Sequence, residues 1–68
     1  MMRNIEAERG RMQLSKEAVS KELGITSRTY NGYIQELRPI PSDKIRKMIK
    51  IFGCSSDYLL GLTDMRTH

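Results

Sequence analysis

The 68-residue chain contains very little of several residue types, and each shortage limits what the protein can be. It has one cysteine, Cys54, so no disulfide can form within it and a reducing compartment suits it. No apolar run approaches the ~20 residues that span a bilayer, and the first residues show no signal-peptide pattern. We therefore expect a soluble, cytoplasmic protein.

Residues for catalysis and metal binding are also scarce. The one histidine is the last residue, His68, and the sequence shows no nucleophile set, metal-ligand spacing or glycine-rich phosphate loop. A chain of this length buries only about 60% of its unfolded surface, which gives one small core and no enclosed chamber. We expect no enzyme activity, no cofactor, no metal and no small-molecule ligand.

Positive charge and helix formers are what the chain does contain. Twelve lysines and arginines outnumber eight acidic residues, for a net charge of +4, which favours a polyanionic partner. The 38% hydrophobic content is enough for a core. Because helix breakers are few, we expect an all-α fold of five short helices. It forms one domain over residues 1–68, with a core from about 4 to 62 and a frayed C-terminal tail.

Capping residues and apolar spacing predict the first three helices. The first is expected over about residues 2–12, weakened by Gly10. The second follows an N-cap at Ser15 and ends at Gly24, which suits a left-handed conformation. The third follows an N-cap at Thr26 and runs to about residue 35.

Two prolines separate the third helix from the fourth, because they forbid a helix through residues 38–41. We expect Ser42 to cap a fourth, strongly amphipathic helix that ends at Gly53. Ser55 is expected to cap a short fifth helix that stops at Gly61.

The connection between the second and third helices carries the most informative motif. A helix, a glycine, one apolar residue and an N-cap before another short helix describe a helix-turn-helix. Gly24 allows a sharp turn, Ile25 fills the angle between the helices, and Ser20 is small enough for them to approach closely. The motif predicts that these two helices pack as one unit.

The third helix has an unusually slim outward face. Its apolar residues, Tyr30, Tyr33, Ile34 and Leu37, share one side, and its other side carries Ser27, Arg28, Asn31, Gly32 and Gln35. Ordinary solvent faces favour larger polar helix formers. A helix that enters the DNA major groove needs a slim face, where arginine pairs with guanine and asparagine with adenine. Glycine costs about 1 kcal/mol of helix stability, which close approach to DNA, or relief of crowding against a neighbour, would explain.

These features resemble the Cro/repressor-type helix-turn-helix regulators, the XRE family, of bacteria and phages. "LSKEAVSKELGITSRTYNGY" is similar to the two central helices of the family, and "IPSDKIRKMIKIFGCSSDYLLGLTD" to its fourth and fifth helices. The resemblance covers about residues 4–64. It implies a lambda-repressor-like fold of five helices whose third helix lies in the major groove.

The resemblance, carried over position by position, also implies a set of DNA contacts. The base-contacting residues expected from it are Ser27, Arg28, Asn31 and Gly32. The expected phosphate contacts are Lys16, Thr26, Thr29, Arg38 and Lys44. For Thr26 the physical reason is that the N-terminus of a helix offers backbone N–H groups to a phosphate.

One departure from the family concerns an ion pair. The family often joins an arginine of the first helix to a glutamate late in the third. Arg9 matches the arginine, but Ile34 stands at the second place, so we expect that pair to be missing. Glu36 is the nearest substitute, although its angle around the helix does not suit the role.

We therefore expect a nucleoid-associated transcriptional regulator that binds double-stranded DNA sequence-specifically. It would be a repressor acting as a homodimer on a pseudo-palindromic operator. Tyr58, Leu59 and Leu60 either fill the core or form the dimer contact. The alternative is a protein-interaction module on the same fold, such as an antitoxin or an anti-repressor partner. The basic run Lys44, Arg46, Lys47 and Lys50 fits the solvated side of an amphipathic helix better than a second DNA surface. Lys44 is the exception, because it lies near the start of the helix.

Overall fold

A computed structural model describes residues 1–66, and within them the chain forms five α-helices and no strand. The helices are α1 (Arg3–Arg11), α2 (Lys16–Leu23), α3 (Ser27–Ile34), α4 (Ser42–Phe52) and α5 (Ser56–Leu59). The all-α, five-helix prediction is confirmed, and the helix ends lie close to the expected ones. None of the helices in residues 1–66 is long and apolar enough to cross a membrane.

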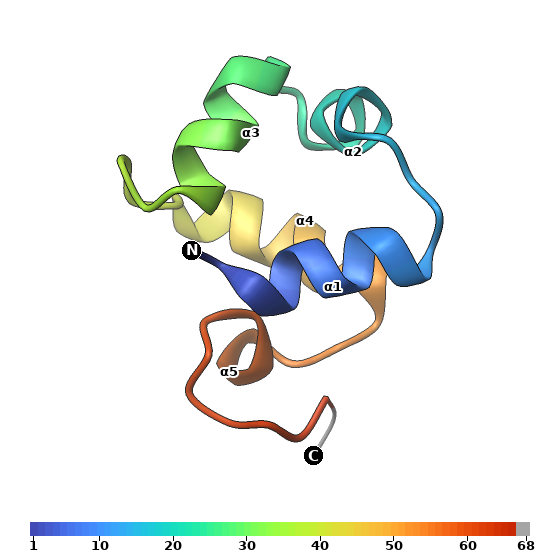
Figure 1. Ribbon diagram of the computed structural model, residues 1–68, viewed down its shortest axis with the longest axis vertical. Helices are drawn as coiled ribbons and strands as arrows, with labels where there is room; N and C mark the ends of the chain where they lie inside the picture. Colours follow the sequence, from blue (N-terminus) through green and yellow to red (C-terminus); the bar gives the residue numbers. More distant parts are fainter. Residues whose placement is uncertain (67–68) are drawn as a thin grey trace.

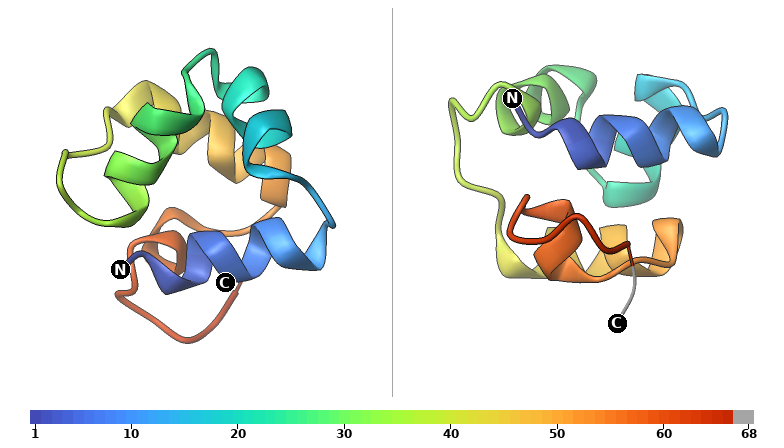
Figure 2. Two further views of the ribbon diagram at one scale, coloured as in Figure 1. Left: turned by 45° about the horizontal axis from the view of Figure 1, so that its top comes forward. Right: turned by 60° about the horizontal axis from the view of Figure 1, so that its bottom comes forward.

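The helices are arranged so that one side of α3 stays uncovered by any other helix. α2 and α3 lie together at one end of the molecule, at the top of Figure 1, and α5 lies at the other. α1 packs against α3 and α5, while α4 packs against α2 and α5. The two further views in Figure 2 show the same arrangement, in a molecule of 30 × 23 × 19 Å.

Three of the four expected N-caps are present as hydrogen bonds. The hydroxyls of Ser15, Thr26 and Ser55 accept the backbone N–H three residues further on, at 3.0, 3.1 and 3.1 Å. The expectation for Ser42 is wrong, because Ser42 is already the first residue of α4 and makes no capping bond. Pro41 takes the cap position, since its fixed φ of −60° suits the extended entry to a helix.

The core draws on every helix and on the segment before α5. Its buried apolar residues are Ile5, Val19, Leu23, Tyr30, Tyr33, Ile34, Met48, Phe52, Cys54 and Leu59. Cys54 is buried, as expected. Leu37 was expected to continue the apolar side of the third helix, but it is 80% exposed. The reason is that α3 ends at Ile34 and Glu36 turns the chain with a φ of +60°.

The segment after α5, for which we expect a frayed tail, makes hydrogen bonds to the rest of the molecule as far as residue 66; Thr67 and His68 lie outside the described residues. The backbone N–H of Ser55 donates to the carbonyl oxygen of Arg66 at 3.0 Å. The Arg66 guanidinium donates to Glu8 Oε1 at 2.8 Å and to the carbonyl oxygen of Phe52 at 2.5 Å. These bonds tie the segment after α5 to α1 and to the end of α4.

Glu8 explains why this segment is held. Its side chain is only 3% exposed, and Arg11 and Arg66 both pair with it, at 3.1 and 2.8 Å. Burial raises the pKa of Glu8, but the hydrogen bonds from the two arginines outweigh that effect and leave the pKa below its ordinary value. A buried carboxylate needs such partners, and one of them comes from the far end of the chain.

Candidate nucleic-acid interface

The turn between α2 and α3 has the geometry that the motif predicts. Gly24 ends α2 in the left-handed conformation, with φ of +71°. The N–H of Ile25 then donates to the carbonyl oxygen of Ser20 at 3.0 Å, and the Ile25 side chain packs against the core. Ser20 is 2% exposed, and its hydroxyl donates to the carbonyl oxygen of Lys16 at 2.6 Å. The small side chain therefore lets the helices approach without leaving a buried hydroxyl unbonded.

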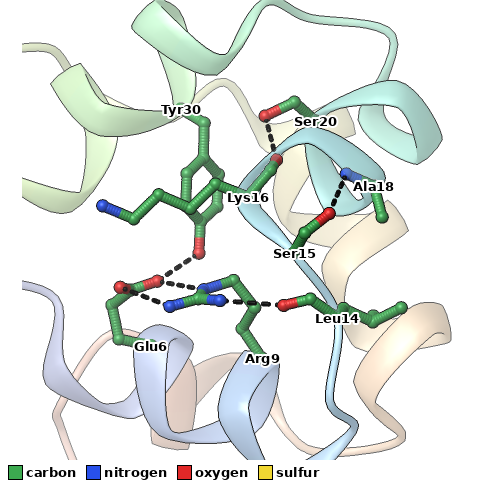
Figure 3. Close-up of polar contacts among 8 residues, drawn as sticks. All are labelled: Glu6, Arg9, Leu14, Ser15, Lys16, Ala18, Ser20 and Tyr30. Atoms are coloured by element: carbon green, nitrogen blue, oxygen red, sulfur yellow. Dashed lines mark hydrogen bonds and ion pairs between the residues drawn. The ribbon is translucent and has the colours of Figure 1, made fainter.

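The inward side of α3 is attached to α1 through the Tyr30 phenol. The fully buried Tyr30 donates its hydroxyl to Glu6 Oε2 at 2.6 Å, as Figure 3 shows. Arg9 holds the same carboxylate with two bonds of 2.8 and 3.1 Å, and it also donates to the carbonyl oxygen of Leu14 at 2.8 Å. This network joins α1, the segment before α2, and α3.

The network also sets the pKa values of its members. The hydrogen bond from Arg9 is the largest influence, and together with the bond from Tyr30 it lowers the pKa of Glu6 against the effect of burial. Burial and the Glu6 carboxylate raise the pKa of Tyr30 well above its ordinary range. Glu6 is thus charged and Tyr30 neutral at neutral pH, which is the combination their hydrogen bond requires.

The expected absence of an ion pair between Arg9 and the end of α3 is confirmed. Arg9 pairs with Glu6 in its own helix, and Ile34 is buried with 2% exposure. Glu36 does not substitute, since its carboxylate pairs with the N-terminal amine of Met1 at 2.7 Å. Sequence reasoning missed Glu6, although its spacing of three residues from Arg9 is a signal for a pair on one helix face.

The outward side of α3 presents side chains that have no partner within residues 1–66. Arg28 and Asn31 are exposed and Ser27 is half-buried, and none of the three side chains makes a hydrogen bond or ion pair with another described residue. Thr26 and Thr29 bond to each other at 3.0 Å at the start of α3. The structure therefore places four of these expected contact residues on α3 and the fifth, Thr26, at its N-cap.

Gly32 differs from its expected position on the open face. It is buried, and a Cβ added to it would lie 3.3 Å from Cδ of Arg38. The chain turns at Glu36 after the end of α3, and the exposed Arg38 side chain returns to lie over Gly32. At this point of α3 the Arg38 side chain, and not Gly32, therefore forms the surface of the protein.

The basic residues of the chain divide into paired and unpaired groups. Within the described residues, ion pairs engage Arg9, Arg11, Lys44 and Arg66. The basic side chains that make no ion pair there are Arg3, Lys16, Lys21, Arg28, Arg38, Arg46, Lys47 and Lys50. Lys16 lies beside the Tyr30 and Glu6 network, near enough to lower the pKa of Glu6. Lys44 is 19% exposed and already lies 3.5 Å from the carboxylate of Asp43.

Comparison with known proteins settles the family. The helix-turn-helix family matches residues 5–59, a range that runs from α1 to the last residue of α5 and contains both helices of the motif. The chain belongs to the XRE-type helix-turn-helix family. The resemblance that the sequence suggested is thus confirmed, with its lambda-repressor-like fold class, and this family is one of DNA-binding transcription regulators.

A curated relative supports the assignment to the XRE-type helix-turn-helix family. The chain is 36% identical over 52 residues to YobD of Bacillus subtilis (strain 168), described as an uncharacterized HTH-type transcriptional regulator. The aligned part is 76% of this chain and 46% of YobD, so the chain spans less than half the length of that relative. No solved structure matches the chain.

Proposed function

We propose that the chain binds double-stranded DNA sequence-specifically by placing the outward side of α3 in the major groove. The observation that carries the proposal is the set of side chains on this side that have no hydrogen bond or ion pair within residues 1–66, above all Arg28 and Asn31. Arg28 would pair with guanine and Asn31 with adenine, and Ser27 would contact a neighbouring base. A good bidentate pair discriminates against the wrong base by about 1–3 kcal/mol.

Phosphate contacts would fix α3 in the groove. Lys16 and Arg38, which make no ion pair with any described residue, would supply charge from α2 and from the loop after α3. The α3 N-terminus supplies backbone N–H groups near Thr26 and Thr29. Lys44 completes the proposed set, but it must exchange its Asp43 partner for the phosphate, so we expect the weakest contribution from it.

We further propose that two copies act together as a repressor. A homodimer on a pseudo-palindromic operator would place its two α3 helices about 34 Å apart in successive major grooves and block access of polymerase. Leu59 fills the core with 1% exposure, so the dimer contact falls to its neighbours. Leu60 and Leu62, 44% and 73% exposed, and the half-buried Tyr58 are the candidates.

Selection of bound duplexes from a randomised DNA pool near physiological salt, followed by sequencing, tests the proposal. We expect an enriched inverted repeat. Arg46→Ala is a matched control because Arg46 is an exposed arginine on α4 with no ion pair among the residues that the structure describes. The repeat that this variant selects should equal that of the wild type. A pool that stays random would refute specific binding and would favour the alternative of a protein-interaction module.

A further inference from the structure

Gly32 stands in a place where glycine has no local reason to be. It lies inside α3 with an ordinary helical backbone, so no left-handed conformation requires it. Almost any other residue would form the helix better. Gly32 is buried, so a neighbouring residue covers it, and contact with that neighbour can explain the glycine.

The neighbour is the stem of Arg38. The position of a Cβ on Gly32 would lie 3.3 Å from Cδ, 3.5 Å from Cγ and 3.5 Å from Nε of Arg38. Optimal contact between carbon atoms begins at about 3.5 Å, so a methyl group at residue 32 would require the stem to move outward by a few tenths of an ångström. Gly10, inside α1, offers a contrast, because nothing lies within 4 Å of its Cβ position.

The place that Arg38 occupies is part of the recognition surface. Gly32 follows Arg28 by four residues, so the two positions lie one above the other on the same face of α3. Arg38 covers the spot that a side chain at residue 32 would fill. Its guanidinium makes no hydrogen bond or ion pair within residues 1–66, which leaves it available to an anion.

We propose that Gly32 is a positioning residue that lets the aliphatic part of the Arg38 side chain pack against α3, and that it makes no DNA contact of its own. This packing would hold the Arg38 guanidinium near Gly32, where it could bind a phosphate at the edge of the groove. This inference rests on the proposed function, and it replaces the direct base contact expected of Gly32.

A double-mutant cycle tests the packing of Arg38 against Gly32, and the duplex enriched by the selection is the probe. Gly32→Ala, Arg38→Ala and the double variant are compared with the wild type by fluorescence anisotropy over a range of salt concentrations. Arg38→Ala should weaken binding about tenfold and reduce the slope of log K against log salt by about 0.9. Gly32→Ala displaces the Arg38 stem without removing its charge, so it should weaken binding by a smaller factor, to every duplex alike. It should add nothing once Arg38 is absent.

Two controls separate the packing of Arg38 against Gly32 from effects of the substitution on helix formation and folding. Gly10→Ala makes the same change in a helix with free space, and it should leave DNA affinity unchanged. Thermal melting by circular dichroism shows whether each variant is folded. If Gly32→Ala melts below the wild type while the double variant melts no lower than Arg38→Ala, the clash with Arg38 is confirmed directly.

The outcomes distinguish this inference from the proposed function. If the affinity losses of the two single variants multiply in the double variant, or if Gly32→Ala loses affinity for some duplexes only, the proposed packing is refuted. Direct contact of Gly32 with DNA would then be favoured. Unchanged affinity in folded Gly32→Ala would overturn the proposed packing as well. If the wild type binds no duplex, the proposed function fails and this inference fails with it.

Discussion

Removing the hydroxyl of Tyr30 tests how α3 is attached to the rest of the molecule. Tyr30→Phe keeps the buried ring and deletes only the hydroxyl that donates to Glu6 at 2.6 Å. A hydrogen bond to a charged group contributes about 1.5–3 kcal/mol. The Glu6 side chain keeps its two bonds from Arg9 and is 20% exposed, so water can replace the lost donor. We therefore expect the lower limit, a loss of about 1.5 kcal/mol in the free energy of unfolding.

The pH dependence of this loss gives a second, independent expectation. The pKa of Glu6 in the folded protein lies below its ordinary value of 4.5, chiefly because of Arg9 and also because of Tyr30. A depressed pKa adds stability that is present above the unfolded value and is lost as pH falls through the folded pKa. The difference between wild type and variant should thus be full near neutral pH and should shrink in acid.

Urea unfolding followed by circular dichroism measures both expectations, and thermal melting should show a drop of about 6–12 °C for a domain of this size. Tyr33→Phe is the matched control. Tyr33 is also buried in α3, with 6% exposure, but its hydroxyl makes no hydrogen bond within residues 1–66. Equal losses in the two variants, or a loss in Tyr30→Phe that persists unchanged in acid, would refute the role given to Glu6.

Three further predictions concern DNA contacts, caps and the C-terminal segment. Arg28→Ala should relax base preference at one position of each half-site, whereas Lys16→Ala should weaken binding to all duplexes and lower the salt slope by about 0.9; the reverse pattern in a selection would exclude both roles. Ser55→Ala should cost about 1 kcal/mol in urea unfolding, while Ser42→Ala, which breaks no capping bond, should cost under about 0.5 kcal/mol. A similar cost for the two would show that Ser42 is a cap after all. Arg66→Ala should lower the melting temperature more at neutral pH than in acid, because its buried partner carboxylate has a lowered pKa. An unchanged melting temperature would mean that the segment after α5 is not held.

The sequence predicts well those features that depend on residues adjacent in the chain. The caps at Ser15, Thr26 and Ser55 and the left-handed turn at Gly24 each depend on a few adjacent residues. Ser42 failed although its chemistry suits a cap, because the fixed backbone of Pro41 moved the start of α4 by one residue.

Features that depend on contacts between distant or turned segments were not predictable in this way. Glu8 and Arg66 are 58 residues apart, and no local pattern connects them. Leu37 continues the apolar spacing of α3, but the left-handed turn at Glu36 carries it into solvent and brings Arg38 over Gly32. The DNA contacts named from the sequence remain predictions.

The inward side of α3 stabilises the fold and the outward side does not, and this separation affects how the sequence of such a protein can evolve. Tyr30, Tyr33 and Ile34 hold the helix in place, whereas the exposed side chains of Arg28 and Asn31 make no hydrogen bond or ion pair within residues 1–66. Substitutions at the outer positions are therefore close to neutral for stability. If α3 reads DNA as proposed, a lineage of such proteins can acquire a new operator by replacing one or two outer side chains, with no compensating change in the core.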